Sequence, residues 1–377
     1  MKALDGHILT PRGFIRGRIG IDGRLLASVV GEPVAEVAVR DSTLPIVLPG
    51  FVDLHVHGGG GADVMDGDDA ALKVAQVHVQ HGTTSMLATT MTAPADDLRV
   101  AFAGVAAARI STNGATAAAH IHGVHLEGPF IGASKLGAQP DFTRPISLAE
   151  VQALHAVAPI TLITVAPEAA ADGEDSSISA LVQAGFRVQL GHSGASYEAA
   201  KAALDAGATG FTHLYNAMSG LHHRQPGMVG AALAHAGHAE VIPDLLHVHP
   251  GAIRVALRSI AGLYCVTDST AAAGMPDGEY RLGRQLVTRC MGGVRLADGT
   301  LAGSTLTMDD ALCNLINALG LSLAEASLRT STLAADYIGA TQRGRLVAGA
   351  FADMVVFDRD LQLCDVIAEG LSVHGRD

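Results

Sequence analysis

The sequence contains no tryptophan, and aromatic residues make up only 4% of its 377 residues. It also lacks any run of lysine or arginine: 25 basic residues stand against 37 acidic ones, and the formal net charge is −12. A protein that binds nucleic acid needs a basic patch or stripe to neutralise phosphates. We therefore expect no nucleic-acid partner.

Long apolar runs are absent as well, and none approaches the roughly 20 residues of a membrane-spanning helix. The N-terminal segment MKALDGHILTPRG lacks the apolar core and the small-residue cleavage site of a signal peptide. We therefore expect a cytoplasmic protein with no membrane partner.

Cysteine is scarce and widely spaced. No CxxC pair occurs that could begin a zinc knuckle or a redox site. We expect reduced structural thiols at Cys265, Cys290, Cys313 and Cys364.

What the sequence does contain is a large apolar fraction, 49%, together with 44 glycines. A chain of this length and composition can bury the core of one large domain and still have residues left for a small satellite. The 18 histidines are more informative, because histidine is seldom used so freely without a chemical role.

From residue 46 onward, short β-rich runs alternate with longer stretches of helical character. This pattern is typical of repeated βα units around a parallel sheet. Eight strands, each apolar inside and polar where it ends, predict an α/β protein with a (β/α)₈ TIM-type barrel over residues 46–341. The predicted strands are Ile46–His57, Thr83–Thr90, His120–Leu126, Ile160–Ala166, Phe186–Gly191, Gly210–Tyr215, Val241–His247 and Gly262–Asp268.

Helices are predicted between these strands, several of them beginning at an Asp or Ser that can cap the first turn. A loop, TDSTAAAGMPDGEYRLG, is expected after the eighth strand. The predicted helices are Asp68–Gln80, Ala95–Ile110, Ser147–Val157, Ser196–Asp205, Ala252–Ile260, Met308–Leu319 and Leu323–Ile338.

The two ends of the chain differ from the rest and are predicted as short strands with turns. Neither end has enough apolar residues for a core of its own. We therefore expect residues 1–45 and 342–377 to pair into one small β-sandwich domain beside the barrel.

The first strand ends in His55-Val56-His57. Residues i and i+2 of a strand project to the same face, so both imidazoles can reach one point, as in a metal chelate. Taken alone, the pair is also compatible with two solvated histidines on a rim.

Four further polar residues end other predicted strands: Glu127 the third, His192 the fifth, His213 the sixth and Asp268 the eighth. The carboxyl ends of barrel strands meet on one face, so these residues should converge with His55 and His57. Imidazole and carboxylate ligands without cysteine suit zinc, or iron. One ion or two could be held, the second if Glu127 bridges.

Asp268 has a different expected role. A carboxylate beside a metal site can accept a proton from water and later donate it to a leaving group, so Asp268 is the candidate general acid/base as well as a ligand. A capping role after the strand is the structural alternative.

A second polar set is expected on the same rim, formed by Asn216, Ala217, Arg224 and His247. Arg224 offers a bidentate fork for a phosphate, and Asn216 and His247 offer further donors. A solvated basic loop is the alternative interpretation of Arg224.

Several motifs together resemble the N-acetylglucosamine-6-phosphate deacetylases of the amidohydrolase superfamily, over nearly the whole chain. The HxH pair alone marks only the superfamily, whereas the EGPF, HLYNAM and HHRQPG segments resemble the deacetylases specifically. The motifs are PGFVDLHVHG (49–58), GVHLEGPFI (123–131), LGHS (190–193), THLYNAM (212–218), HHRQPG (222–227), LHVHP (246–250), VTDSTAAAGMPDGEY (266–280) and LAGSTLTMDDAL (301–312).

The resemblance implies a metal-dependent enzyme that removes acetate from N-acetylglucosamine 6-phosphate and leaves glucosamine 6-phosphate. It implies metal ligation by Glu127, His192 and His213, and catalysis by Asp268. It implies phosphate and sugar contacts by His247, Asn216 and Ala217, and a homodimer in which Arg224 reaches the phosphate of the neighbouring subunit.

Two features differ from, or vary within, the family pattern. Gln139 stands in KLGAQPDF where the family commonly has a histidine that polarises the acetyl carbonyl, and glutamine can donate a hydrogen bond but cannot titrate. The first-strand HxH, which some members lack, is kept, so two metals are possible. Another amidohydrolase activity, on a related N-acetyl amino sugar or a cyclic amide, is the alternative, and a metal- or sugar-phosphate-binding regulator without activity is a more distant one.

Overall fold

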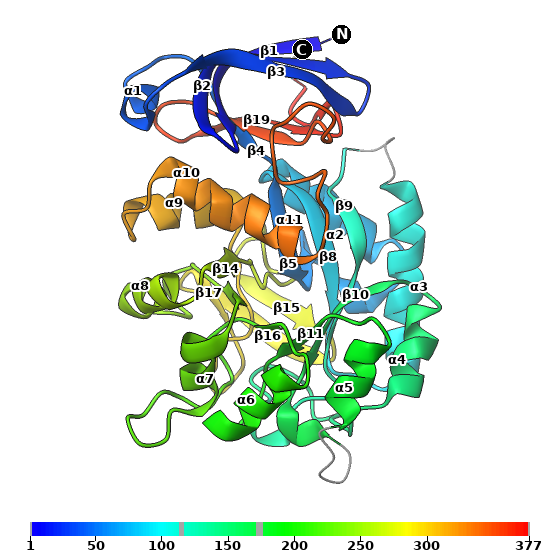
Figure 1. Cartoon of the computed structure of the whole chain (residues 1–377). Coiled ribbons are helices and arrows are strands. Elements are labelled where there is room, and N and C mark those ends of the chain that lie inside the picture. The colour runs from blue at the N-terminus through cyan, green and yellow to red at the C-terminus, as the bar shows by residue number, and fades with distance from the viewer. Residues whose placement is uncertain (1, 113–116, 171–175, 376–377) are drawn as a thin grey trace.

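The computed structural model describes residues 2–112, 117–170 and 176–375, without the side chain of Ser176. Eight parallel strands form one sheet in the order β14-β13-β12-β11-β10-β9-β8-β5 (Figure 1). These strands are β5 (Phe51–Val56), β8 (Thr83–Thr90), β9 (His120–Glu127), β10 (Ile160–Val165), β11 (Val188–Leu190), β12 (Gly210–Phe211), β13 (His238–Val241) and β14 (Gly262–Cys265).

The sheet closes into a barrel through the segment that follows β14. Val56 forms a parallel bridge with Ser269, and the Asp268 N–H donates to the His55 carbonyl at 2.9 Å. The predicted (β/α)₈ barrel is therefore confirmed. Its closing seam runs beside the candidate metal ligands.

Helices surround the barrel strands, apart from α1 (Glu36–Arg40), which lies beside the sheet formed by the chain ends (Figure 1). Ser147, Ser196 and Ser322 cap three of them, each accepting a backbone N–H three residues further on. The helices are α1 (Glu36–Arg40), α2 (Ala70–Gln80), α3 (Ala95–Ser111), α4 (Leu148–His155), α5 (Ser176–Gln183), α6 (Tyr197–Asp205), α7 (Gly227–His235), α8 (Pro250–Ser259), α9 (Met308–Asn317), α10 (Leu323–Ser327) and α11 (Leu333–Tyr337), with a π-helical turn, η5 (Leu328–Thr332), and 3₁₀ turns η1 (Val64–Asp66), η2 (Ala133–Lys135) and η3 (Pro167–Ala169).

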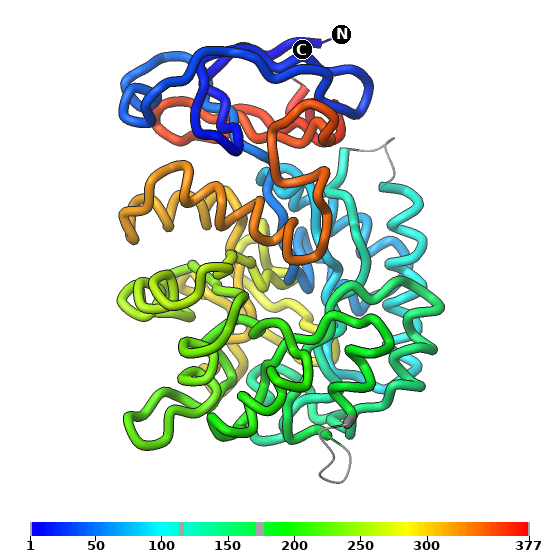
Figure 2. The backbone as a smooth tube through the Cα atoms, viewed as in Figure 1, coloured from blue at the N-terminus to red at the C-terminus, as the bar shows by residue number. Residues whose placement is uncertain are grey.

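Both ends of the chain meet in a separate seven-stranded sheet, as predicted. Figure 2 shows the two termini side by side, beyond the helices at one end of the barrel. The sheet curls over its own apolar cluster, which includes Ile8, Ile19, Leu26 and Met354. In sheet order its strands are β20 (Leu371–Ser372), β19 (Leu363–Ala368), β18 (Met354–Phe357), β4 (Ile46–Pro49), β1 (Lys2–Thr10), β2 (Gly13–Asp22) and β3 (Leu25–Pro33).

The strand predicted over Ile46–His57 is two strands. Ile46–Pro49 pairs with β1 and β18 in the terminal sheet, and Phe51–Val56 pairs with β8 in the barrel. Gly50 lies at the break, and a Cβ there would come within 2.3 Å of Thr84 Oγ1. The chain therefore passes from one sheet to the other where only glycine fits.

The seventh strand lies earlier in the chain than the predicted range Val241–His247. The strand is His238–Val241, and Pro243, which has no N–H for a ladder, lies in the loop beyond it. Asp244 stabilises this loop by accepting the backbone N–H groups of Leu246 and His247.

The segment predicted as a loop after the eighth strand contains secondary structure. Residues from 278 on form a three-stranded antiparallel sheet, and its apolar face packs against Met91 and Ala272. Its strands are β15 (Gly278–Leu282), β16 (Gln285–Cys290) and β17 (Gly293–Arg295). A separate short hairpin, β6 (Gly58–Gly59) with β7 (Ala62–Asp63), follows β5 in the chain. Across the residues that the structure describes, the helices are too short or too polar to span a bilayer.

Candidate active site

The six residues predicted to bind metal lie where the chain reaches the carboxyl end of a barrel strand. All are buried, with exposed fractions between 0% and 8%. They are His55 in β5, His57 directly after it, Glu127 at the end of β9, His192 after β11, His213 after β12 and Asp268 after β14.

Three of these residues have a backbone conformation that side chains other than glycine seldom adopt. The φ angle is +47° at His192, +27° at His213 and +49° at Asp268. Such a conformation costs about 1–3 kcal/mol and persists only where the surrounding structure enforces it. At Asp268 the enforcement is visible, because its N–H donates to His55 and its carbonyl accepts from Ser304.

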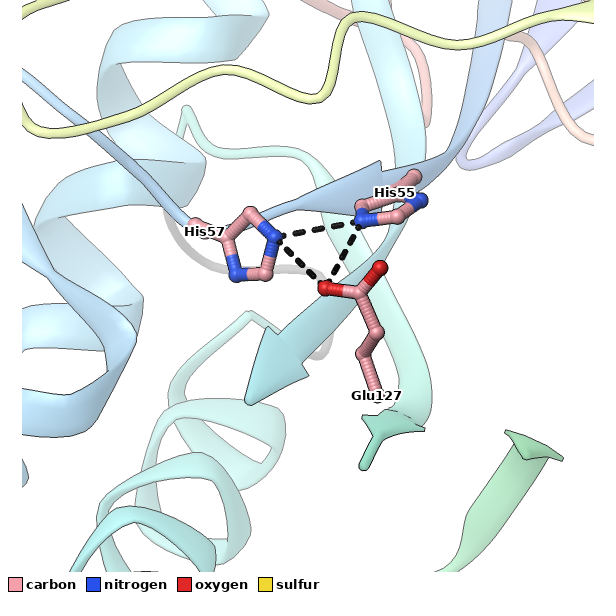
Figure 3. Close-up of side chains that lie close together, drawn as sticks. All are labelled: His55, His57 and Glu127. Carbon is pink, nitrogen blue, oxygen red and sulfur yellow. Dashed lines mark hydrogen bonds and ion pairs between the residues drawn. The ribbon is translucent and has the colours of Figure 1, made fainter. Parts of the chain in front are cut away.

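The first group of ligand atoms surrounds one oxygen of Glu127. Glu127 Oε2 lies 3.2 Å from His57 Nε2 and 3.5 Å from His55 Nε2, and the two nitrogens are 3.1 Å apart. Figure 3 shows both rings turned toward this carboxylate. Asp268 Oδ1 joins the group, 3.3 Å from His55 Nε2 and 3.2 Å from His57 Nε2.

The second group surrounds the other oxygen of the same carboxylate. Glu127 Oε1 lies 3.1 Å from His192 Nε2 and 3.0 Å from His213 Nε2, and these nitrogens are 3.0 Å apart. His192 Nδ1 donates to the Lys135 carbonyl at 2.8 Å, which turns Nε2 toward Glu127. Glu127 is therefore shared by both groups.

These donor atoms fit a divalent cation. Each group brings three ligand atoms within 4.8 Å of one another. In a tetrahedral site with metal–nitrogen bonds of about 2.0–2.1 Å, neighbouring ligand atoms lie about 3.3 Å apart, close to the spacing of the histidine nitrogens in both groups. Nitrogen and oxygen donors without sulfur suit zinc or iron.

The charges of the two carboxylates agree with this interpretation. Burial raises the pKa of Glu127, but His55 and His192 outweigh burial and hold that pKa well below its usual range. For Asp268, burial again raises the pKa, and His55 and His57 lower it below its usual range. Both carboxylates are therefore ionised and available as ligands at neutral pH.

A third cluster, His55 with His125 and Glu240, is also close enough to hold an ion. Its polar atoms are already hydrogen-bonded, however. His55 Nδ1 and Glu240 pair with each other at 3.0 Å, and His125 Nε2 pairs with the Thr164 hydroxyl at 2.7 Å. We interpret this cluster as support for the ligands and not as a further metal site.

A cavity of about 240 Å³ opens over the metal-binding residues. Four of the five predicted substrate-binding residues line it: Gln139, Asn216, Ala217 and His247. The remaining wall comes from Met91, Gly137, Ala138, Leu282, Thr300, Leu301 and Gly303.

Gln139 is held in one orientation at the cavity wall. Its Oε1 accepts the Thr92 N–H at 2.7 Å, so its Nε2 faces Glu127 and donates to Oε2 at 2.6 Å. The side chain is 4% exposed. Gln139 therefore presents a neutral donor group beside the metal ligands.

His247 is oriented by Asp244. Its Nδ1 lies 2.6 Å from Asp244 Oδ2 and its backbone N–H donates to Asp244 Oδ1. Burial lowers the pKa of His247, but the bond to Asp244 outweighs it and the pKa is raised. His247 is thus suited to contact an anion in the cavity.

Arg224 is not brought into this site. It is exposed in the loop between β12 and α7, and it is not among the residues that line the cavity of its own chain. The structure therefore leaves its predicted contact with a neighbouring subunit untested.

Sequence reasoning missed several supporting residues, above all Glu240, Asp244 and His125. The acidic residue between Ala239 and Val241 was the available signal for Glu240. Leu301 and Gly303 belong to the LAGSTLTMDDAL motif, but their side chains gave no sign that they line the cavity.

Comparison with known proteins agrees with this geometry. The amidohydrolase family matches residues 46–372. An N-acetylglucosamine-6-phosphate deacetylase from Lysinibacillus sphaericus is 38% identical over 86% of this chain and 84% of its own. An N-acetylgalactosamine-6-phosphate deacetylase from Escherichia coli O157:H7 is 38% identical over 97% of each chain.

A solved structure agrees over almost the whole chain. It is that of an N-acetyl-D-glucosamine-6-phosphate deacetylase mutant from Mycobacterium smegmatis in complex with N-acetyl-D-glucosamine-6-phosphate. It matches with a TM-score of 0.88, at 32% identity, over 98% of both chains. The chain therefore belongs to the amidohydrolase family, within its group of N-acetylglucosamine-6-phosphate deacetylases.

Proposed function

We propose that this protein hydrolyses the acetamide of N-acetylglucosamine 6-phosphate to glucosamine 6-phosphate and acetate. The observation that carries the proposal is the convergence of four histidines and two carboxylates beneath one cavity. The names of the relatives and of the matching structure support this substrate.

The proposed cofactor is a divalent metal, one or two ions per subunit, with zinc as the first candidate and iron as the alternative. Glu127, His192 and His213 would hold one ion, and His55 and His57 with Asp268 and Glu127 a second. A divalent ion supplies Lewis-acid chemistry when bound, because it lowers the pKa of a water molecule and polarises a carbonyl.

The protein's own residues move the protons and hold the substrate. Asp268 accepts a proton from the attacking water and then donates it to the amine as the carbon–nitrogen bond breaks. Gln139 donates a hydrogen bond at the acetyl end of the cavity. At the other end His247, Asn216 and the backbone of Ala217 bind the phosphate and the sugar.

We further propose a cytoplasmic homodimer, in which Arg224 supplies a phosphate ligand to the neighbouring subunit. The exposed position of Arg224 in its own chain supports this arrangement, because a bidentate guanidinium is suited to phosphate. A charged sugar phosphate does not cross a membrane unaided, which favours the cytoplasm. Within each subunit, the proposed domains are the barrel, predicted over 46–341, and the paired segments 1–45 and 342–377, with the strand Ile46–Pro49 paired in the terminal sheet.

A second candidate substrate is N-acetylgalactosamine 6-phosphate. The relative from Escherichia coli O157:H7 that carries this substrate in its name is as similar as the glucosamine enzyme, and it is matched over more of the chain. The two sugars differ only in the configuration at C4, remote from the acetamide. Gln139 lies beside Glu127 at the acetyl end and therefore does not by itself select between the two sugars.

Acetate release from four compounds tests the proposal: the 6-phosphates of N-acetylglucosamine and N-acetylgalactosamine, and both unphosphorylated sugars. We expect the phosphorylated glucosamine compound to give the highest kcat/KM and the unphosphorylated sugars far lower values. Equal rates with and without phosphate would contradict the proposed specificity. If none of the four compounds released acetate, the proposed activity would be contradicted.

A further inference from the structure

A row of buried polar side chains crosses the barrel interior next to the metal-binding residues. Barrel interiors are filled mainly by branched apolar side chains, so a polar row needs a physical reason. Each strand from β8 to β14 or its first following residue contributes one member, and every member is 0% exposed. The members are Thr89, His125, Thr164, Gln189, Thr212, Glu240 and Tyr264.

The hydrogen bonds of this row run in one direction, which Gln189 sets because an amide oxygen only accepts and an amide nitrogen only donates. Gln189 Oε1 accepts from the Thr212 hydroxyl at 3.0 Å, and Nε2 donates to the Tyr264 oxygen at 2.7 Å. The Tyr264 O–H is then left to donate, and its acceptor is Glu240 Oε1 at 3.3 Å.

The other half of the row has the same direction. Since the Thr212 hydroxyl donates to Gln189, it must accept from the Thr164 hydroxyl, 2.7 Å away. Thr164 in turn accepts from His125 Nε2, also at 2.7 Å. The Thr89 hydroxyl lies 3.5 Å from His125 Nδ1, and from His125 a chain of donors runs to Glu240.

Glu240 accepts two further hydrogen bonds, both on Oε2. One comes from His55 Nδ1 at 3.0 Å and the other from the backbone N–H of His213 at 3.1 Å. Because Nδ1 of His55 donates to Glu240, Nε2 is the ring nitrogen left to bind a metal, and it faces Glu127 and Asp268. His213 belongs to the other ligand group, so Glu240 contacts both groups.

We propose that Glu240 is a positioning residue for the whole metal centre. It selects Nε2 as the metal-binding atom of His55 and holds the chain at His213 in the turn that aims this histidine at Glu127. The inference rests on the proposed metal-dependent function, because it concerns the binding of that metal. Replacing a carboxylate that orients a metal-binding histidine typically weakens metal affinity about 10–100-fold.

Glu240→Leu tests this role with a side chain of similar size. Leucine offers no acceptor in either orientation, so His55 Nδ1 and the His213 N–H both lose the hydrogen bond to Oε2. Protein stripped by a chelator is titrated with zinc, and the number of ions and their Kd values are measured. We expect the affinity of the ion beside His55 to fall about 10–100-fold, while circular dichroism shows a folded protein.

Tyr264→Phe is the matched control, because it removes a donor to Oε1 and leaves both bonds to Oε2. We expect it to bind zinc as the wild type does, even where it lowers the melting temperature. Equal zinc affinity in wild type and Glu240→Leu would overturn the inference, as would an equal loss in both variants. Failure of the wild type to bind zinc would instead overturn the proposed metal centre.

A second measurement does not depend on the folding of a variant. Nitrogen-15 NMR of histidine-labelled, zinc-loaded wild type, with His55 assigned by comparison with His55→Asn, reports which ring nitrogen binds the metal. We expect Nε2 at His55, with the proton on Nδ1. Metal binding through Nδ1 would overturn the inference.

Discussion

Asp268 combines three properties in one side chain: it lines the cavity, it lies within 3.3 Å of two histidine nitrogens, and its backbone is held at a positive φ. A ligand needs only the second of these. Access to the cavity is what a group that exchanges protons with substrate requires. The structure therefore favours proton transfer over the capping role that the sequence also allowed.

Asp268→Asn is expected to lose at least about two orders of magnitude in turnover and to keep the ion held by Glu127, His192 and His213. Asparagine preserves the size of the side chain but cannot accept the proton. Acetate release and elemental metal analysis on the same sample check both statements.

Asp96→Asn is the matched control for that experiment, because Asp96 is an exposed carboxylate on α3 paired only with Arg99 among the described residues. It should have wild-type turnover. If Asp268→Asn deacetylated at a rate close to that of the wild type, the acid/base assignment would be wrong.

At the scale of elements, the sequence predicted best what periodicity and strand ends encode. Strand ends located all six ligand-type residues, because a polar residue after an apolar run stands out. The row from His125 to Glu240 was missed, since a polar residue inside a strand resembles one on a solvated face until the barrel closes around it. Strands β15 to β17 were missed because they are short and their alternation of apolar and polar residues is weak.

The start of β9 carries a consequence for stability at acid pH. Burial, followed by the nearby Arg343, lowers the pKa of His120 to about 3, and burial with the neighbouring His120 lowers the pKa of His122 to about 3. In the unfolded chain both titrate near 6.5. Between about pH 3 and about pH 6.5 the unfolded state therefore binds more protons than the folded state. The stability that depends on these two neutral histidines is fully present above about pH 6.5 and is lost as the pH falls.

His122→Gln is expected to reduce that loss. At pH 5, compared with pH 7, a histidine with this shift lowers the free energy of unfolding by on the order of 2 kcal/mol. A glutamine does not titrate and causes no such loss. Urea unfolding at pH 7 and pH 5 measures the difference. His223→Gln, on an exposed loop, serves as the control, and an identical pH dependence in wild type and His122→Gln would refute the prediction.

For the whole molecule, the terminal sheet depends on a buried ion cluster at its junction with the barrel. Arg343, only 3% exposed, pairs with Asp353 before β18 and with Glu369 after β19, and its guanidinium lies 3.9 Å from the ring centroid of Phe351. Removing one partner of a buried ion pair leaves charge without compensation.

Arg343→Met is therefore expected to destabilise the protein by about 3–5 kcal/mol, seen as a lower urea midpoint. Arg345→Met is the control, because Arg345 pairs with the half-exposed Asp336, and such pairs contribute about 0–1 kcal/mol. Similar midpoints for the two variants would show that the cluster does not hold the sheet in place.

The measurement that tests the central proposal most directly follows metal content and acetate release together. Protein stripped by a chelator is titrated with zinc, and N-acetylglucosamine 6-phosphate turnover is recorded at each metal content. We expect no turnover without metal and recovery in proportion to the ions bound, up to one or two per chain. Undiminished acetate release by the metal-free protein would contradict it.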